Sequence, residues 1–126
     1  MSGLLLAAGL VAIVTGVLHA VLGEILILRH LDRLDGLPPL LGSKELPKQT
    51  LRFTWHLPSI LAWAFAAILI RYARLAELGA DDRFVVATIS VAFLVCAGIV
   101  LLISRGRHPG WTAFLGAGVL CWMAIA

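Results

Sequence analysis

Four long apolar runs, separated by short charged segments, constrain this chain more than any other feature of its sequence. They cover residues 4–28, 53–70, 84–103 and 111–126. A helix needs about 20 predominantly apolar residues to cross the hydrocarbon core of a bilayer. The first three runs reach or nearly reach that length, and the fourth lies near the lower limit. The pattern therefore predicts an all-α integral membrane protein, a four-transmembrane-helix up-down bundle in one domain over residues 1–126.

Composition supports the same class of protein. Hydrophobic residues make up 61% of the chain and charged residues 13%, against about 45–50% and about 25% in soluble proteins. No positive charge precedes the run over 4–28, and this run is longer than the apolar part of a signal peptide. We therefore expect it to be a retained membrane span.

The positive charges predict an orientation. Of the ten Lys and Arg residues, five lie in the first loop, about 29–52, three in the second loop and two in the third. The positive-inside rule then places loops one and three in the cytoplasm and both termini outside, as in a bacterial inner membrane protein. These charges form no basic patch or tail, so a nucleic-acid partner is not expected.

Leucines in the first loop favour an interfacial position, and Ser43 is placed to cap a short lead-in helix near Pro47.

Small residues form a stripe along the first predicted span. Gly9, Gly16 and Gly23 recur every seven residues. Such a stripe lets another helix approach closely, which is how membrane helices commonly pack. We expect this face to lie against protein, within the bundle or between subunits, and His19 on the same stripe to face the bundle interior.

Polar residues in the first two spans indicate a candidate site. In the second span, one helical face carries a polar stripe: Gln49, Arg52, His56, Ser59 and Trp63. Glu24 in the first span is costly in an apolar environment unless it is protonated, paired or hydrated. Antiparallel helices bring Glu24 close to the depth of Arg52 and His56, so we expect these three to form a cluster in the cytoplasmic half. A purely structural ion pair between Glu24 and Arg52 is the alternative interpretation.

The first functional hypothesis is an oligomeric transporter or channel for a small ion or cationic solute. In it, Glu24, Arg52, His56 and Ser59 bind the ion or substrate. The size of the chain and the carboxylate in its first span are similar to those of the small multidrug-resistance transporters. Those proteins have short loops throughout and place the acid nearer the middle of the span, unlike this chain. One chain of four spans is too small to enclose a pathway, so this hypothesis needs a homo-oligomer.

Two other hypotheses stay open at this stage. His19 and His56 on adjacent helices could ligate haem b or a metal ion in a membrane redox protein. The chain could instead be an accessory or assembly subunit of a larger membrane complex. An enzyme is less favoured, because the chain has no Ser-x-x-Lys motif, no HExxH motif and no clustered pair of acids.

Overall fold

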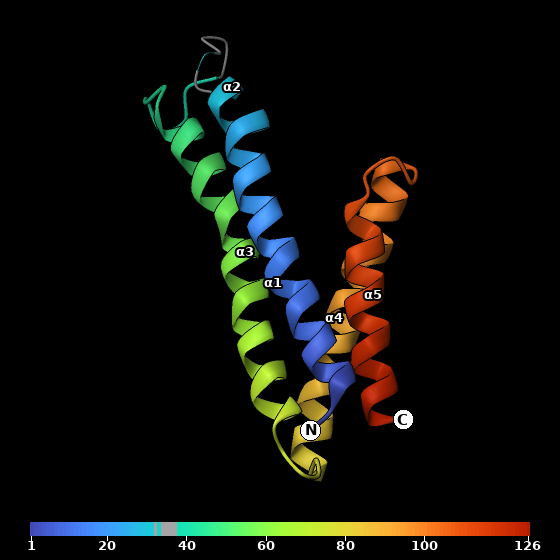
Figure 1. Ribbon diagram of the computed structural model, residues 1–126. Coiled ribbons are helices and arrows are strands. Elements are labelled where there is room, and N and C mark those ends of the chain that lie inside the picture. Colours follow the sequence, from blue (N-terminus) through green and yellow to red (C-terminus); the bar gives the residue numbers. More distant parts are fainter. Residues whose placement is uncertain (32, 34–37) are drawn as a thin grey trace.

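A computed structural model describes residues 1–31, 33 and 38–126 of the chain. Its regular elements are all helical: α1 (Gly3–Gly23), the π turn η1 (Glu24–Leu28), α2 (Arg29–Leu31), α3 (Leu46–Ala73), α4 (Ala80–Ser104) and α5 (Gly110–Ile125). The elements α1, η1 and α2 follow one another directly and form one continuous rod (Figure 1). No β-strand occurs among the described residues.

Three of the helical segments are long and apolar enough to cross a membrane. They are Gly3–Leu31, Glu45–Ala73 and Ala80–Ser104, and α5 is a shorter apolar helix. Because a leucine- and alanine-rich helix satisfies its own backbone hydrogen bonds, it can enter lipid without exposing unpaired polar groups. The prediction of helical structure is confirmed for the described residues, and three of the helices have the length and apolar composition that a membrane span needs.

The first loop is shorter than predicted. The first rod continues to Leu31 and α3 begins at Leu46, so both helices extend into the range 29–52. Oγ of Ser43 accepts hydrogen bonds from the backbone N–H of Glu45 and of Leu46, each at 3.3 Å. The lead-in helix expected near Pro47 is therefore the first part of α3 itself. Residues 32 and 34–37 of the expected interfacial loop lie outside the described residues.

The helices pair as two antiparallel hairpins, α1 with α3 and α4 with α5. The hairpins meet mainly through α1 and α5, at the end that holds both termini (Figure 1). At the opposite end they diverge, and the α1/α3 hairpin projects past the turn between α4 and α5 (Figure 1). The part of α1/α3 near the termini is thus packed against the second hairpin, and the part at the opposite end is not.

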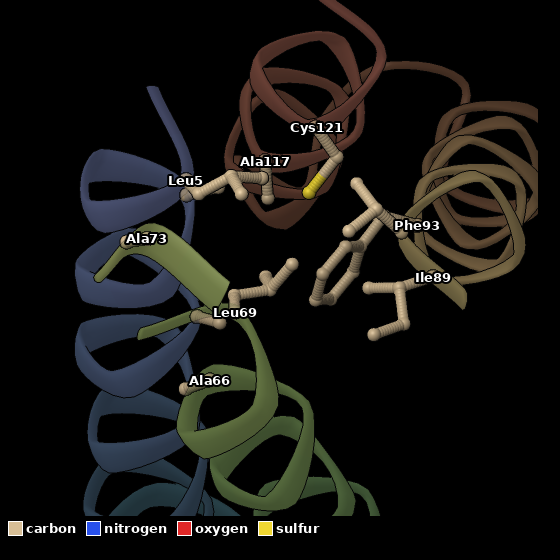
Figure 2. Packing of buried hydrophobic residues seen from close by; sticks show 11 residues of the cluster. Leu5, Ala66, Leu69, Ala73, Ile89, Phe93, Ala117 and Cys121 are labelled. Carbon is tan, nitrogen blue, oxygen red and sulfur yellow. The ribbon is translucent and has the colours of Figure 1, made fainter. Parts of the chain in front are cut away.

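The buried core occupies the end where the hairpins meet (Figure 2). Side chains from four helices contribute to it: Leu5, Ala8 and Ala12 from α1, Ala66, Leu69 and Ala73 from α3, Val86, Ile89 and Phe93 from α4, and Ala117 and Cys121 from α5. The ring of Phe93 lies 6.0 Å from that of Phe65 in α3 and 6.2 Å from that of Phe114 in α5. Phe93 therefore links the two hairpins through aromatic contacts.

The glycine stripe of α1 faces α3. Each of its members lies against one bulky side chain: Gly9 against Ile70, Gly16 against Trp63 and Gly23 against Trp55. A Cβ added at Gly16 would lie 2.6 Å from Nε1 of Trp63 and 3.2 Å from the carbonyl oxygen of Ser59. The absence of a side chain is what allows the two backbones to approach so closely.

Hydrogen bonds join α4 and α5 at two levels. Oγ of the buried Ser90 in α4 donates to the carbonyl oxygen of Gly118 in α5 at 2.7 Å. At the terminal end, Nη1 of Arg83 donates to the carbonyl oxygen of Ile125 at 2.8 Å. The turn between α4 and α5 begins with Arg105 in the left-handed conformation, at φ 51°. These contacts hold α4 and α5 together as a unit.

Candidate functional site

Glu24, Arg52 and His56 meet where η1 lies beside the N-terminal half of α3. Nη2 of Arg52 donates to Oε1 of Glu24 at 3.2 Å, and Nε2 of His56 lies 3.5 Å from Oε2. The side chains are 32% exposed at Glu24, 42% at Arg52 and 36% at His56. One carboxylate is thus shared between a guanidinium and an imidazole, and each group keeps an open face. We call these three residues the Glu24 cluster.

The position of Arg52 along α3 relates the cluster to the apolar part of the helix. Arg52 and Arg71 bracket that part, and a rise of about 1.5 Å per residue separates them by about 29 Å. This matches the hydrocarbon thickness of a bilayer, about 30 Å. With the apolar part of α3 in the membrane, Arg52 lies at one boundary and His56 one turn inside it. Glu24 contacts both residues and so lies at the same level.

The helix changes form at Glu24. In η1 the backbone N–H of Arg29 donates to the carbonyl oxygen of Glu24, five residues earlier. Leu28 at the other end of the turn is 2% exposed, whereas Glu24 is 32% exposed and contacts Arg52 and His56 of α3. Single π turns inside α-helices are frequent at functional sites. Nothing in the apolar run 4–28 predicts this turn.

His19 does not join the Glu24 cluster but pairs with Trp55. Nε2 of His19 donates to the carbonyl oxygen of Trp55 at 3.1 Å, and Nε1 of Trp55 donates to the carbonyl oxygen of His19 at 3.1 Å. The two rings are stacked, with centroids 4.8 Å apart and planes 5° from parallel. His19 therefore faces α3, and its proton-bearing Nε2 is engaged with a carbonyl.

The two histidines proposed as haem or metal ligands have separate partners. Nε2 of His19 is held by the carbonyl oxygen of Trp55, and Nε2 of His56 lies beside Glu24. An axial pair formed through these nitrogens would require both contacts to break. In the described part of the chain, no group of three or more His, Cys, Asp or Glu is placed to hold a metal ion. This arrangement gives the haem alternative no support.

Ser59 lies in the seam between α1 and α3, apart from the charged groups. Its side chain is 1% exposed, and its carbonyl oxygen is one of the atoms next to Gly16. Among the described residues, Oγ of Ser59 has no hydrogen-bond partner. Ser59 shares a helical face with Arg52 and His56, as its spacing predicts, but it sits deeper and against a glycine. It is therefore a packing residue in this structure.

Trp55 is not among the candidate residues predicted from the sequence. The structure places its indole against Gly23 and His19. A signal for this role does exist in the sequence. In an antiparallel pair, glycines at intervals of seven on one helix call for bulky residues at similar intervals on the other, and Trp55, Trp63 and Ile70 have about that spacing.

The other two histidines lie apart from these contacts. His30 is exposed in α2. Nδ1 of His108 accepts a hydrogen bond from the backbone N–H of Gly110 at 3.0 Å and so stands at the start of α5.

Comparison of the chain with protein-family models, with curated proteins and with solved structures found no significant match. Any functional conclusion therefore rests on the chemistry of the Glu24 cluster and on the arrangement of the two hairpins.

Proposed function

We propose that this chain is a small four-span membrane protein that carries protons or small cations as an oligomer, with Glu24 as the binding group. The observation that carries the proposal is the carboxylate of Glu24, held within hydrogen-bond or ion-pair distance of Arg52 and His56. Ionisable groups within a membrane helix are usually paired or hydrated, and they usually serve a function. The open faces of the three side chains allow exchange with the surroundings.

The proposed topology places the cluster on the cytoplasmic side. Seven of the ten Lys and Arg residues lie in the first and third loops, and three lie in the second. The positive-inside rule then puts both termini outside, in the cytoplasmic membrane of a bacterium. In this topology α5 is the fourth span, with its 16 residues covering about 24 Å.

The chemistry of the cluster suits exchange of one positive charge for another. Oε1 of Glu24 faces Arg52 and Oε2 faces His56. A proton can be accepted at either the carboxylate or the imidazole, since both groups change charge on protonation. A cation other than a proton has to displace one of the two partners from the carboxylate. Arg52 stays positively charged throughout. It therefore continues to neutralise the carboxylate of Glu24 while the proton or cation near Oε2 is exchanged.

An oligomer is part of the proposal because a bundle of four helices is too small to enclose a route through the membrane. An open apolar groove of about 260 Å³ lies on α4 and α5, lined by Leu94, Val119, Trp122 and Met123. It does not involve the Glu24 cluster. A pathway past Glu24 needs a second surface opposite α1 and α3, and another copy of the chain supplies it in the simplest way.

A second candidate is an assembly subunit of a larger membrane complex. The observation that favours it is the apolar surface of the projecting half of α1/α3, which the second hairpin does not cover. Its exposed side chains include Leu22, Ile25, Leu26, Leu51, Phe53 and Leu57. Lipid or a partner helix can cover such a surface equally well.

Proton flux into liposomes tests the leading proposal. The purified protein is reconstituted, a pH gradient is imposed, and its decay is followed with an enclosed pH-sensitive dye. We expect the wild-type protein to speed the decay relative to protein-free liposomes. Glu24→Gln should return the rate to that of protein-free liposomes. The matched control is Glu77→Gln, which changes an exposed acid in the loop between α3 and α4 and should behave as wild type.

Two outcomes would contradict this proposal. Wild-type liposomes that hold the gradient as long as protein-free ones would exclude proton transport and favour the assembly candidate. A Glu24→Gln protein that conducts as fast as wild type would leave Glu24 as a structural ion pair. Circular dichroism and gel filtration of each variant establish that the compared proteins are folded.

A further inference from the structure

The indole of Trp55 lies next to the Glu24 cluster on both helices. On the first rod, Gly23 lies against the indole of Trp55, and Glu24 follows it directly. On α3, Trp55 is followed directly by His56. The indole ring of Trp55 therefore lies between the two backbones that carry Glu24 and His56.

Two hydrogen bonds fix that ring in place. Nε1 of Trp55 donates to the carbonyl oxygen of His19, and Nε2 of His19 donates to the carbonyl oxygen of Trp55, each at 3.1 Å. Each side chain thus binds the backbone of the opposite helix, and the stacked rings prevent either from rotating alone. Reciprocal bonds of this kind resist both sliding of the helices along each other and rotation about their axes.

We propose that Trp55, held by His19, is the positioning residue of the Glu24 cluster. It sets the axial and rotational register at which the carboxylate reaches both Arg52 and His56. The π turn begins immediately after this fixed point, at Glu24, so the rod is held as an α-helix up to Gly23 and widens only beyond it. The proposal rests on the proposed function for its effect on transport, but the geometry it asserts can be tested without any transport assay.

Trp63 provides a matched control on the same pair of helices. Its Nε1 donates to the carbonyl oxygen of Ile13 at 3.3 Å, and its ring lies against Gly16. Trp63 therefore makes the same type of contact from α3 to α1, two turns deeper than Trp55. Replacing either tryptophan by phenylalanine removes one indole N–H and a similar amount of packing, but only Trp55 is adjacent to the cluster.

The experiment measures the coupling between Glu24 and Arg52 in three backgrounds. Melting temperatures of Glu24→Gln, Arg52→Gln and the double variant are determined in detergent, alone and combined with Trp55→Phe or Trp63→Phe. The coupling is the difference between the Tm loss of the double variant and the sum of the losses of the two single variants. It reports the pairing of Glu24 with Arg52, because a loss of stability common to all variants of one background cancels in this difference. We expect this coupling between Glu24 and Arg52 to be present in the wild-type and Trp63→Phe backgrounds and absent in the Trp55→Phe background. Coupling that persists with Trp55→Phe would overturn the proposal.

A second route covers the case in which Trp55→Phe does not fold. His19→Ala keeps the indole but removes the donor to the Trp55 carbonyl, whereas His19→Gln keeps an N–H donor at a similar reach. We expect the coupling to be lost with His19→Ala and restored with His19→Gln. Equal coupling in these two variants would also overturn the proposal.

Proton flux of the same variants separates this inference from the proposed function. If Glu24→Gln conducts as wild type while the Glu24–Arg52 coupling depends on Trp55, the positioning role stands and the transport role fails. If Glu24→Gln stops the flux while the coupling is independent of Trp55, the transport role stands and the positioning role fails.

Discussion

Gly16 shows how single residues set the spacing of the helices. Its position on α1 is filled by the indole of Trp63, which donates to the carbonyl oxygen of Ile13. In lipid there is no hydrophobic drive between apolar helices, so packing contacts and hydrogen bonds between them carry the association. A methyl group added at Gly16 would therefore disturb the packing and hydrogen bonding between α1 and α3 directly.

Gly16→Ala should therefore destabilise the protein, by about 1–3 kcal/mol, as overpacked sites commonly do. The added Cβ would lie 2.6 Å from Nε1 of Trp63, so the ring must move and its hydrogen bond must weaken. Gly98→Ala is the matched control, because a Cβ there meets nothing within 4 Å and alanine favours the helix by about 1 kcal/mol. Unfolding followed by circular dichroism in detergent compares the two. Equal stability of both variants would mean that the close approach at Gly16 is unimportant.

Ser90 makes the corresponding polar contact between α4 and α5. Its side chain is 0% exposed and donates to the carbonyl oxygen of Gly118. Ser90→Ala should cost about 1 kcal/mol in the free energy of unfolding, the usual size for such a bond. Thr88→Ala is the control, because Oγ1 of Thr88 is bonded to the carbonyl oxygen of Phe84 within α4 itself. A cost at Thr88 as large as that at Ser90 would argue against an interhelical role for the Ser90 hydroxyl.

At the scale of elements, the molecule consists of two hairpins joined at one end. The α1/α3 hairpin is held by glycines against tryptophans, and the α4/α5 hairpin by Ser90 and by Gly118 against Leu94. The hairpins meet mainly through α1 and α5, and Phe93 of α4 adds an aromatic contact with Phe65 of α3. Loss of the Phe93 side chain should loosen the joint more than either hairpin.

Phe93→Ala should lower the free energy of unfolding by about 3 kcal/mol, as expected for a large side chain removed from a core. The ring is 4% exposed, so its loss leaves a cavity between three helices. Phe84 lies earlier in the same helix and is 73% exposed, so Phe84→Ala removes little packing and should have a small effect. Denaturation in detergent, followed by circular dichroism, measures both. Similar losses would show that the aromatic contacts do not join the hairpins.

At the scale of the whole molecule, the two hairpins differ in length. The rod Gly3–Leu31 of 29 residues measures about 43 Å, and α5 with 16 residues about 24 Å. Together with the contact at the terminal end, this places the Glu24 cluster in the part of α1/α3 that projects beyond the second hairpin (Figure 1). The proposed topology assigns this projecting part to the cytoplasmic boundary.

Cysteine labelling tests that topology in intact cells. Cys96 and Cys121 are first replaced by alanine, and single cysteines are introduced as Ser2→Cys or Lys44→Cys. A membrane-impermeant maleimide should label position 2 in intact cells and position 44 only after permeabilisation, because the positive-inside rule puts the first loop inside. The reverse labelling pattern would invert the orientation while leaving the helices as they are.

The amino-acid sequence by itself determined the helical class, the approximate helix positions and the pairing of the charged groups. The four apolar runs require helices, because lipid offers no other partner for backbone hydrogen bonds. The positions of Gly9, Gly16 and Gly23 are enough to predict a close helix approach, since that spacing repeats one helical face. The cost of a lone carboxylate in an apolar span was enough to place Glu24 near Arg52.

Only the tertiary structure decided which faces meet, at what level, and with which local distortion. The partner of His19 is Trp55, Ser59 is buried against Gly16, and a π turn begins at Glu24. None of these follows from periodicity, because a periodic pattern gives the face of a helix but neither the neighbour nor the axial offset. In a membrane, hydrophobicity cannot choose the neighbour either, since lipid chains are as apolar as the helices. Steric fit and hydrogen bonds between helices determine which helices become neighbours. These contacts exist only once the helices are packed.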